Sequence, residues 1–236
     1  MPDGTEHATD AESIVRGLSV VRERIATAAR SAGREPTEVR LVAVSKLQPV
    51  TAIQAAADAG QVDFGESRGQ ELVAKLDAAP ATVRWHFVGQ LQRNKVSSVV
   101  GRVALIHSVD RISLAETIAL QASRRDVRQH VLVQVNIAGE SRKAGCAPSE
   151  LEGLLERIGD LDGIEATGLM TIPALDDDPA PVFAQLRAFR ARLAPSFPRL
   201  AELSMGMSAD LETAVTHGAT IVRVDTAIFG ARPRNR

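Results

Sequence analysis

The sequence is poor in the residues that several classes of protein require. Its 236 residues include one cysteine, no tyrosine, one tryptophan and six phenylalanines. A single cysteine cannot form an internal disulfide or a cysteine-built zinc site, and no pair of histidines has metal-ligand spacing, so no metal centre is predicted. We interpret the cysteine, Cys146, as a small buried residue.

Long apolar runs and an excess of one charge are also lacking. No run approaches the roughly 18 apolar residues that span a bilayer, so no membrane partner is predicted. The polar start of the chain lacks the features of a secretory signal, and we expect a cytoplasmic protein. Lys and Arg number 28 against 29 Asp and Glu, a net charge of -1. With so few aromatics, this balance argues against nucleic-acid binding.

Short β-branched runs alternate with amphipathic helical stretches along most of the chain. The strand candidates are residues 40–45, 62–64, 83–87, 103–107, 131–136, 164–169, 200–203 and 220–224. Helical stretches such as 50–59, 69–77, 112–125 and 149–158 lie between them. This pattern predicts a parallel sheet in a single α/β domain, a (β/α)8 TIM barrel over residues 11–232. A doubly wound open sheet is the alternative, although no strand is followed by G-x-G-x-x-G.

An extra helix is predicted before the first strand. Ile14, Leu18, Val21 and Ile25 recur at helical spacing, and Gly33 ends the pattern. Residues 1–10 are expected to form a flexible tail, and residues 233–236 a loose end.

A barrel of this kind carries its active site where the strands end. Lys46 directly follows an apolar strand, so partial burial would lower its pKa and make it a nucleophile for aldehydes. The alternative is a lysine at the barrel rim that points into water.

The segment Ser204–Asp210 follows the seventh strand, where this fold often binds phosphate. Gly206 permits an unusual backbone, Ser208 is expected to cap the next helix, and helix N-termini bind phosphate through free N–H groups. An ordinary helix cap is the alternative.

Three polar residues fall within or near predicted strands. Arg223 lies inside the eighth strand, where its charge should meet a carboxylate, a ring nitrogen or a phosphate. His86 and His107 lie near strand ends, and we interpret both as hydrogen-bonded structural histidines.

Several segments together resemble one known family, the pyridoxal phosphate homeostasis proteins (the YggS/PROSC type), whose barrel is like the N-terminal domain of alanine racemase. The resemblance covers residues 14–232. The matching segments are Leu41–Lys46, Phe64–Glu66, Trp85–Gly89, Leu91–Lys95, Gln134–Asn136, Lys143–Gly145, Gly168–Met170, Leu203–Ser208 and Thr226–Arg232.

The resemblance implies a fold-type III protein that binds pyridoxal 5'-phosphate (PLP). It implies that Lys46 carries PLP as a Schiff base and that Arg223 faces the pyridine nitrogen. The phosphate would lie on Ser208 and the backbone N–H groups of Asp225 and Thr226. Other residues expected near the cofactor are Ser67, Asn136, Met170 and Ser204.

A second lysine matches one that this family has at the mouth of the barrel. By the resemblance, Lys143 would hold PLP transiently or assist its transfer. A solvated loop lysine is the equal alternative.

Two positions depart from the family pattern. Ser67 follows Glu66 where the family usually has asparagine, and a hydroxyl cannot copy the reach of an amide. Asp225 stands where the family usually has glycine. A carboxylate near the expected phosphate repels it, and glycine tolerates a positive φ that aspartate does not. We therefore expect weaker retention of the phosphate.

The leading functional hypothesis is a PLP carrier that acts in vitamin B6 homeostasis, releases PLP to apo PLP-dependent enzymes and has no substantial catalysis. It is expected to be a monomer or a weak homodimer. A PLP-dependent racemase, lyase or transferase is the rival. Alanine racemase, whose barrel this chain resembles, uses a tyrosine in its two-base mechanism, and this sequence contains no tyrosine. An adaptor with an empty barrel is the third alternative.

Overall fold

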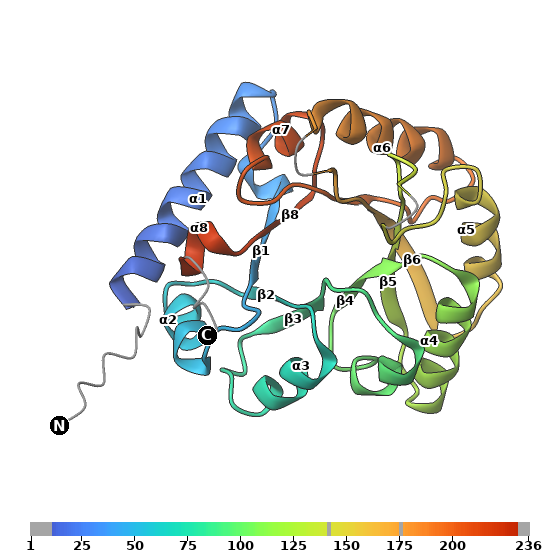
Figure 1. Cartoon of the computed structure of the whole chain (residues 1–236), viewed down its shortest axis with the longest axis horizontal. Coiled ribbons are helices and arrows are strands. Elements are labelled where there is room, and N and C mark those ends of the chain that lie inside the picture. The colour runs from blue at the N-terminus through green and yellow to red at the C-terminus, as the bar shows by residue number, and fades with distance from the viewer. Residues whose placement is uncertain (1–10, 141–142, 175–176, 231–236) are drawn as a thin grey trace.

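The computed structural model describes residues 11–140, 143–174 and 177–230. In these residues eight parallel strands close into a barrel in the order of the sequence, and helices surround it (Figure 1). This confirms the predicted (β/α)8 barrel and excludes the open doubly wound sheet. The expected tail at 1–10 and the expected end at 233–236 lie outside the described residues.

The predicted bounds of strands and helices differ from the observed ones by at most two residues. The strands are β1 Arg40–Val44, β2 Asp63–Glu66, β3 Arg84–Phe87, β4 Leu105–Val109, β5 Gln129–Gln134, β6 Ile164–Met170, β7 Glu202–Ser204 and β8 Ile221–Val224. The α-helices are α1 Ala11–Ser31, α2 Val50–Asp58, α3 Gly69–Leu76, α4 Ile112–Arg124, α5 Leu151–Gly159, α6 Ala180–Leu193, α7 Leu211–Thr216 and α8 Thr226–Phe229. Two 3-10 helices are η1 Pro36–Glu38 and η2 Arg93–Ser98.

The difference in the bounds of the fourth strand changes where His107 lies relative to the strand end. The fourth strand was expected to end at His107, but β4 continues to Val109. The pairing of β4 with β5 shifts register between Ile106 and Val109, as at a β-bulge. His107 therefore lies within the strand and is fully buried.

The apolar core has two parts. The larger part fills the space between the strands and the surrounding helices. A smaller cluster lies inside the barrel and consists of Val42, Leu105, Leu132, Met170 and Ile221, with Val88 packed against it. The remaining interior positions include buried polar side chains, so the inside of this barrel is only partly apolar.

The barrel closes where β8 pairs with β1, and Val42 lies opposite Arg223 in that pairing. The extra helix α1 covers this closure and packs along α8 (Figure 1). Gly17 allows the close approach, because a Cβ there would lie 2.8 Å from the backbone oxygen of Ala227. The predicted N-terminal helix is thus confirmed, with a structural role at the seam. None of the described helices combines the length and apolarity needed to cross a membrane.

Candidate functional site

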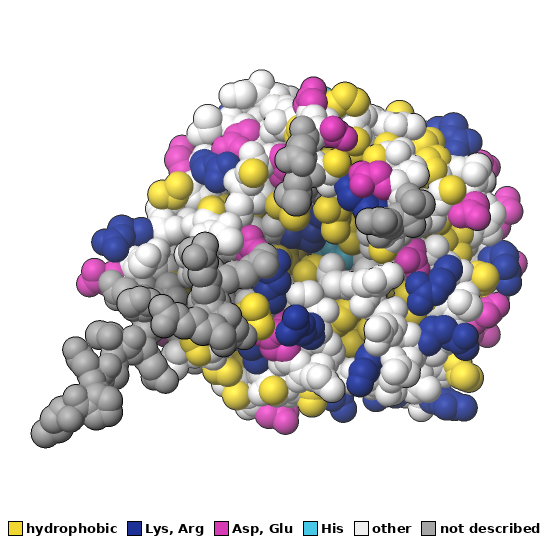
Figure 2. Space-filling view, viewed as in Figure 1, with side chains coloured by type: hydrophobic (Ala, Val, Ile, Leu, Met, Phe, Trp, Pro, Cys, Tyr) yellow, Lys and Arg dark blue, Asp and Glu magenta, His cyan; other side chains and the backbone are white. Residues whose placement is uncertain are grey.

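Lys46 comes directly after β1, at the carboxyl end of the barrel. Its Nζ lies 2.8 Å from Oδ2 of Asp225, the residue that follows β8. The side chains of Lys46 and Asp225 are 29% and 23% exposed. The ammonium is therefore held by an ion pair across the β1–β8 seam rather than extending freely into water. Near the middle of this face, basic, hydrophobic and histidine side chains meet (Figure 2).

Asp225 also engages two of the donors that the resemblance assigns to a phosphate. Its Oδ1 accepts hydrogen bonds from the backbone N–H of Thr226 (2.7 Å) and from the hydroxyl of Ser208 (3.4 Å). The hydroxyl of Thr226 donates to Oγ of Ser208 at 3.3 Å. The φ of Asp225 is -115°, outside the positive region that favours glycine, so the backbone at this position accommodates an aspartate. A carboxylate oxygen thus lies where N–H and O–H donors of two loops converge.

The loop after β7 depends on Gly206. Its φ is +94°, and a Cβ there would lie 2.5 Å from Cβ of Ala214, so only glycine fits. The expected capping role of Ser208 is wrong, because α7 begins at Leu211 and its N-cap residue is Asp210. The hydroxyl of Ser208 turns instead to the loop after β8.

A buried lysine holds the backbone on the amino side of Lys46. Nζ of Lys75, from α3, donates to the backbone carbonyl of Ser45 (2.8 Å) and to Oε1 of Glu66 and of Glu71 (both 2.7 Å). The ammonium has three donors, and each meets an acceptor. Burial raises the pKa of Glu66, and the hydrogen bond from Lys75 opposes that rise only in part. We call Glu66, Glu71 and Lys75 the Lys75 cluster.

The residue on the other side of Lys46 is held by the same cluster. Leu47 has a φ of 63°, a left-handed conformation that costs a residue with a side chain about 1 kcal/mol. Its backbone N–H donates to the carboxylate of Glu71. The backbone on both sides of Lys46 is therefore anchored to the Lys75 cluster. The Lys75 cluster is not among the residues predicted from the sequence, although a carboxylate at the end of a buried strand indicates that a cation lies nearby.

Arg223 lies on β8, two residues before Asp225 and deeper in the barrel. Its Nη1 donates to Oγ of Ser204 (2.6 Å) and its Nη2 to the backbone carbonyl of Thr171 (3.1 Å). Burial lowers the pKa of Arg223 to about 10, so the guanidinium stays charged at neutral pH. Of the three expected kinds of partner, a carboxylate is absent from the hydrogen bonds and ion pairs of Arg223 within the described residues. Ser204 is fully buried and lies beneath the site, between Arg223 and His107.

Met170 ends β6 and is fully buried. It belongs to the apolar cluster inside the barrel, with Val42 and Leu132 among its neighbours. The barrel interior beneath the strand ends is therefore apolar at Met170.

The loop after β5 carries two of the predicted residues. The amide of Asn136 donates to the backbone carbonyls of Glu140 (2.8 Å) and Lys143 (3.5 Å). Nζ of Lys143 lies 2.7 Å from Oε1 of Glu140. Asn136 therefore orders the loop that holds Lys143, and no hydrogen bond or ion pair within the described residues joins either of them to Lys46.

Ser67 follows β2 and lines a small cavity of about 240 Å³ together with Phe87 and Lys95. Lys46 is not among the residues that line this cavity. Of the predicted site residues, the structure thus brings Lys46, Ser208, Asp225 and Thr226 into contact, and the hydrogen bonds and ion pairs of the described residues do not join Ser67 to them.

The described His, Cys, Asp and Glu side chains form no group of three or more that could hold a metal ion. Cys146 is 4% exposed, and burial raises the pKa of its thiol to about 12. This confirms the interpretation of Cys146 as a small buried residue.

Comparisons with known proteins identify the family of this chain. Residues 18–233 match the family described as alanine racemase, N-terminal domain. A pyridoxal phosphate homeostasis protein of Pseudomonas aeruginosa is 40% identical over 221 residues, which cover 93% of this chain and 96% of the relative. PipY of Synechococcus elongatus, in a structure with PLP bound, is 38% identical with a TM-score of 0.80, over 92% of this chain and 100% of that chain.

A more distant likeness concerns the fold alone. Alanine racemase of Corynebacterium glutamicum is 18% identical with a TM-score of 0.68, and the match covers 94% of this chain and 62% of that chain. With its closed barrel, its strand-end lysine and these full-length relatives, the chain belongs to the alanine racemase N-terminal domain family and, within it, to the pyridoxal phosphate homeostasis proteins.

Proposed function

We propose that this protein binds PLP at the carboxyl end of its barrel and acts in PLP homeostasis in the cytoplasm. It holds PLP covalently on Lys46 and releases it to apo PLP-dependent enzymes without substantial catalysis. The relatives named for this role and the PLP bound to PipY support the proposal.

The observation that carries the proposal is the position of the Asp225 carboxylate. Its Oδ1 engages the Ser208 hydroxyl and the Thr226 N–H, and its Oδ2 engages Lys46. The donors that hold this anion are the kind that bind a phosphate. A ligand for this site needs a phosphate for the Ser208 and Thr226 donors and an amine-reactive group for Lys46. PLP has both groups.

When bound, PLP supplies an aldehyde that links covalently to a primary amine with loss of water. Lys46 provides the amine, and Oδ2 of Asp225 is the acceptor for a hydrogen on Nζ. The Ser208 hydroxyl and the Thr226 N–H, which now contact Asp225, would hold the phosphate.

Arg223 fits the other end of the ligand. Within the described residues it donates only to neutral oxygens, so it has further N–H groups for the ring nitrogen. A guanidinium leaves that nitrogen unprotonated, which makes the ring a poor electron sink. This favours storage of PLP over carbanion chemistry.

The internal carboxylate also suits release. When PLP leaves, Asp225 can again pair with Lys46 and accept the same hydrogen bonds, so the empty site keeps its donors satisfied. This lowers the free energy of the empty state relative to the loaded one, as a carrier requires.

A visible spectrum of the protein with PLP tests the proposal. The wild type should show a PLP–lysine absorption band, and Lys46→Arg should lack it, because arginine keeps the charge opposite Asp225 but cannot condense with an aldehyde. Borohydride reduction and peptide mapping should place the label on Lys46. A label on Lys143 instead, or an unchanged band in Lys46→Arg, would contradict the assignment. A wild type without a PLP band would favour the adaptor alternative.

The absence of catalysis has its own test. The 236 residues contain no tyrosine. The tyrosine that alanine racemase uses as one of its two bases therefore has no counterpart in this sequence. Exchange of α-deuterium should be no faster with the loaded protein than with free PLP, for several amino acids. Sustained exchange would establish an enzyme instead.

Release and assembly are measured separately. Loaded protein mixed with an apo-aminotransferase should restore its activity, and light scattering should give the mass of a monomer or of a weak homodimer.

A further inference from the structure

A line of hydrogen bonds runs inside the barrel from Arg223 toward the amino end. Nη1 of Arg223 lies 2.6 Å from Oγ of Ser204, which lies 2.9 Å from Nδ1 of His107. Nε2 of His107 lies 3.0 Å from Nδ1 of His86, and Nε2 of His86 lies 2.8 Å from Oδ1 of Asp63. We call these five residues the interior chain.

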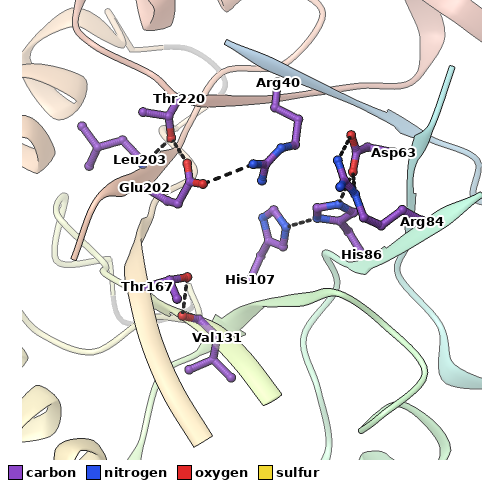
Figure 3. A network of polar contacts seen from close by, with 10 residues as sticks. All are labelled: Arg40, Asp63, Arg84, His86, His107, Val131, Thr167, Glu202, Leu203 and Thr220. Atoms are coloured by element: carbon purple, nitrogen blue, oxygen red, sulfur yellow. Dashed lines mark hydrogen bonds and ion pairs between the residues drawn. The ribbon is translucent and has the colours of Figure 1, made fainter. Parts of the chain in front are cut away.

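The interior chain is shielded from water along most of its length. Ser204, His107 and His86 are at most 1% exposed. Asp63 starts β2 and accepts two hydrogen bonds, of 2.5 and 2.8 Å, from Arg84, which is half exposed at the amino end of the barrel (Figure 3). Only this last contact lies near solvent.

The charges of the interior chain are confined to its two ends. Burial lowers the pKa of His86 and, more strongly, that of His107, so both imidazoles are neutral at neutral pH. Burial alone would raise the pKa of Asp63, but hydrogen bonds from His86 and Arg84 outweigh it and lower that pKa to about 2. A carboxylate therefore stands at one end, the guanidinium of Arg223 at the other, and neutral groups between them.

These end groups fix the position of every hydrogen. A carboxylate only accepts, so His86 carries its hydrogen on Nε2 and accepts at Nδ1. His107 must then donate from Nε2 and accept at Nδ1. The hydroxyl of Ser204 donates to His107 and presents its lone pairs to Arg223, which only donates. All hydrogens point in one direction, from Arg223 to Asp63.

We propose that Asp63 is a positioning residue for the cofactor site and that, through the interior chain, it fixes the orientation of Arg223. If the hydrogens pointed the other way, Ser204 would direct its own hydrogen at the guanidinium. Two donors would then face each other in a buried space, and Arg223 would have to turn away. The inference deepens the proposed function and rests on it, since Arg223 is the residue that faces the ring nitrogen of PLP.

The chain offers a matched pair of variants. Asp63→Asn replaces the carboxylate of the interior chain with an amide, which can donate to His86 and reverse the hydrogens. Glu202→Gln makes the same change at the start of β7, at the same end of the barrel. Glu202 pairs with Arg40 at 3.4 Å and is outside the interior chain (Figure 3).

The first measurement uses full-length protein without PLP. Nitrogen NMR of the imidazole rings at neutral pH should find His86 and His107 neutral in the wild type, with the hydrogen on Nε2. Asp63→Asn should give His107 a mixture of tautomers, and Glu202→Gln should not. A wild-type His107 that is charged or carries its hydrogen on Nδ1 would overturn the inference, even if the variant failed to fold.

The second measurement adds PLP. Asp63→Asn should weaken PLP binding about threefold or more and shift the absorption band of the bound cofactor, whereas Glu202→Gln should leave both near wild-type values. If Asp63→Asn altered the tautomers of His107 but left PLP affinity and the absorption band of bound PLP unchanged, the positioning role would be refuted. A wild type that does not bind PLP would overturn the proposed function and the role assigned to Arg223, while the tautomers would still report on the interior chain itself.

Discussion

Nζ of Lys46 and Oδ2 of Asp225 lie 2.8 Å apart across the junction of the first and last strands. The other carboxylate oxygen of Asp225 accepts the Thr226 N–H and the Ser208 hydroxyl. A single side chain therefore joins the reactive lysine to the donors expected to hold a phosphate. Any ligand that uses both parts of the site must displace this carboxylate first.

Asp225→Gly should tighten PLP binding. A partly exposed ion pair contributes up to about 1 kcal/mol, so removing the competing carboxylate should lower the Kd by about fivefold. The backbone tolerates glycine, because glycine readily adopts a φ of -115°. Titration of each protein with PLP, followed by absorbance, gives the Kd.

Asp225→Asn is the control for this change. Its amide oxygen can still accept the Thr226 N–H, but the negative charge opposite Lys46 is gone. Its Kd should fall between those of the wild type and Asp225→Gly. Equal Kd values in all three proteins would show that Asp225 does not compete with PLP.

Lys75→Met should destabilise the barrel and disturb Lys46. Removing one partner of a buried ion pair leaves Glu66 without its cation, at a cost of about 3 kcal/mol in the free energy of unfolding. Loss of the hydrogen bond to the Ser45 carbonyl should also weaken PLP binding, since the backbone before Lys46 is no longer anchored. Urea unfolding and PLP titration measure the two effects.

Lys95→Met is the matched lysine change, because the Lys95 ammonium has no hydrogen bond or ion pair within the described residues. It should alter the free energy of unfolding by less than about 0.5 kcal/mol. A similar decrease in the free energy of unfolding in Lys75→Met and Lys95→Met would mean that the Lys75 cluster has no special role in stability.

The free energy of unfolding should decrease as the pH falls below about 6.5. An unfolded histidine takes up a proton near that pH, whereas burial lowers the pKa of His107 well below it. Between these two values the unfolded chain binds more protons, so this stability is complete above the unfolded pKa and is lost on acidification. At about pH 5.5, each histidine that stays neutral in the fold costs about 1.4 kcal/mol. Urea unfolding at about pH 7.5 and about pH 5.5 provides the difference.

Two histidine variants locate this effect. His107→Gln should reduce the pH dependence, because glutamine does not titrate. His130→Gln, which changes a half-exposed histidine, should retain it. If the free energy of unfolding depended on pH equally in both variants, His107 would not be the source of that dependence.

Cys146 should resist alkylation in the folded protein. The thiolate is the reactive form, and burial raises the pKa of this thiol to about 12. Iodoacetamide at about pH 8 should label the native protein far more slowly than the protein unfolded in urea. Equally fast labelling of native protein would show that the loop carrying Cys146 opens readily.

The architecture and the position of Lys46 could be predicted because both are local signals. An apolar strand followed by a lysine can be recognised in five residues, and eight alternations of strand and helix indicate the barrel. The interpretation of His86 and His107 as hydrogen-bonded is likewise confirmed, since buried imidazoles need partners.

The partners themselves could not be predicted. They depend on how strands from distant parts of the chain are staggered, since His107 of β4 lies between Ser204 of β7 and His86 of β3. Repulsion between Asp225 and a phosphate stays a prediction from the sequence, whereas the pairing of Asp225 with Lys46 depends on the closure of β8 onto β1. Ser208 was mistaken for a helix cap because Asp210, two residues later, takes that position.

The closure of β8 onto β1 also bears on how the protein folds. Lys46 and Asp225 follow the two strands that are farthest apart in the sequence, so forming their contact has a large loop-closure entropy cost and should occur late in folding. A ligand that binds at the ends of both β1 and β8 would hold these two strands together. By mass action, occupancy of the site would raise the stability of the last-formed pairing in the barrel, so that loading with cofactor and completion of the fold are coupled steps.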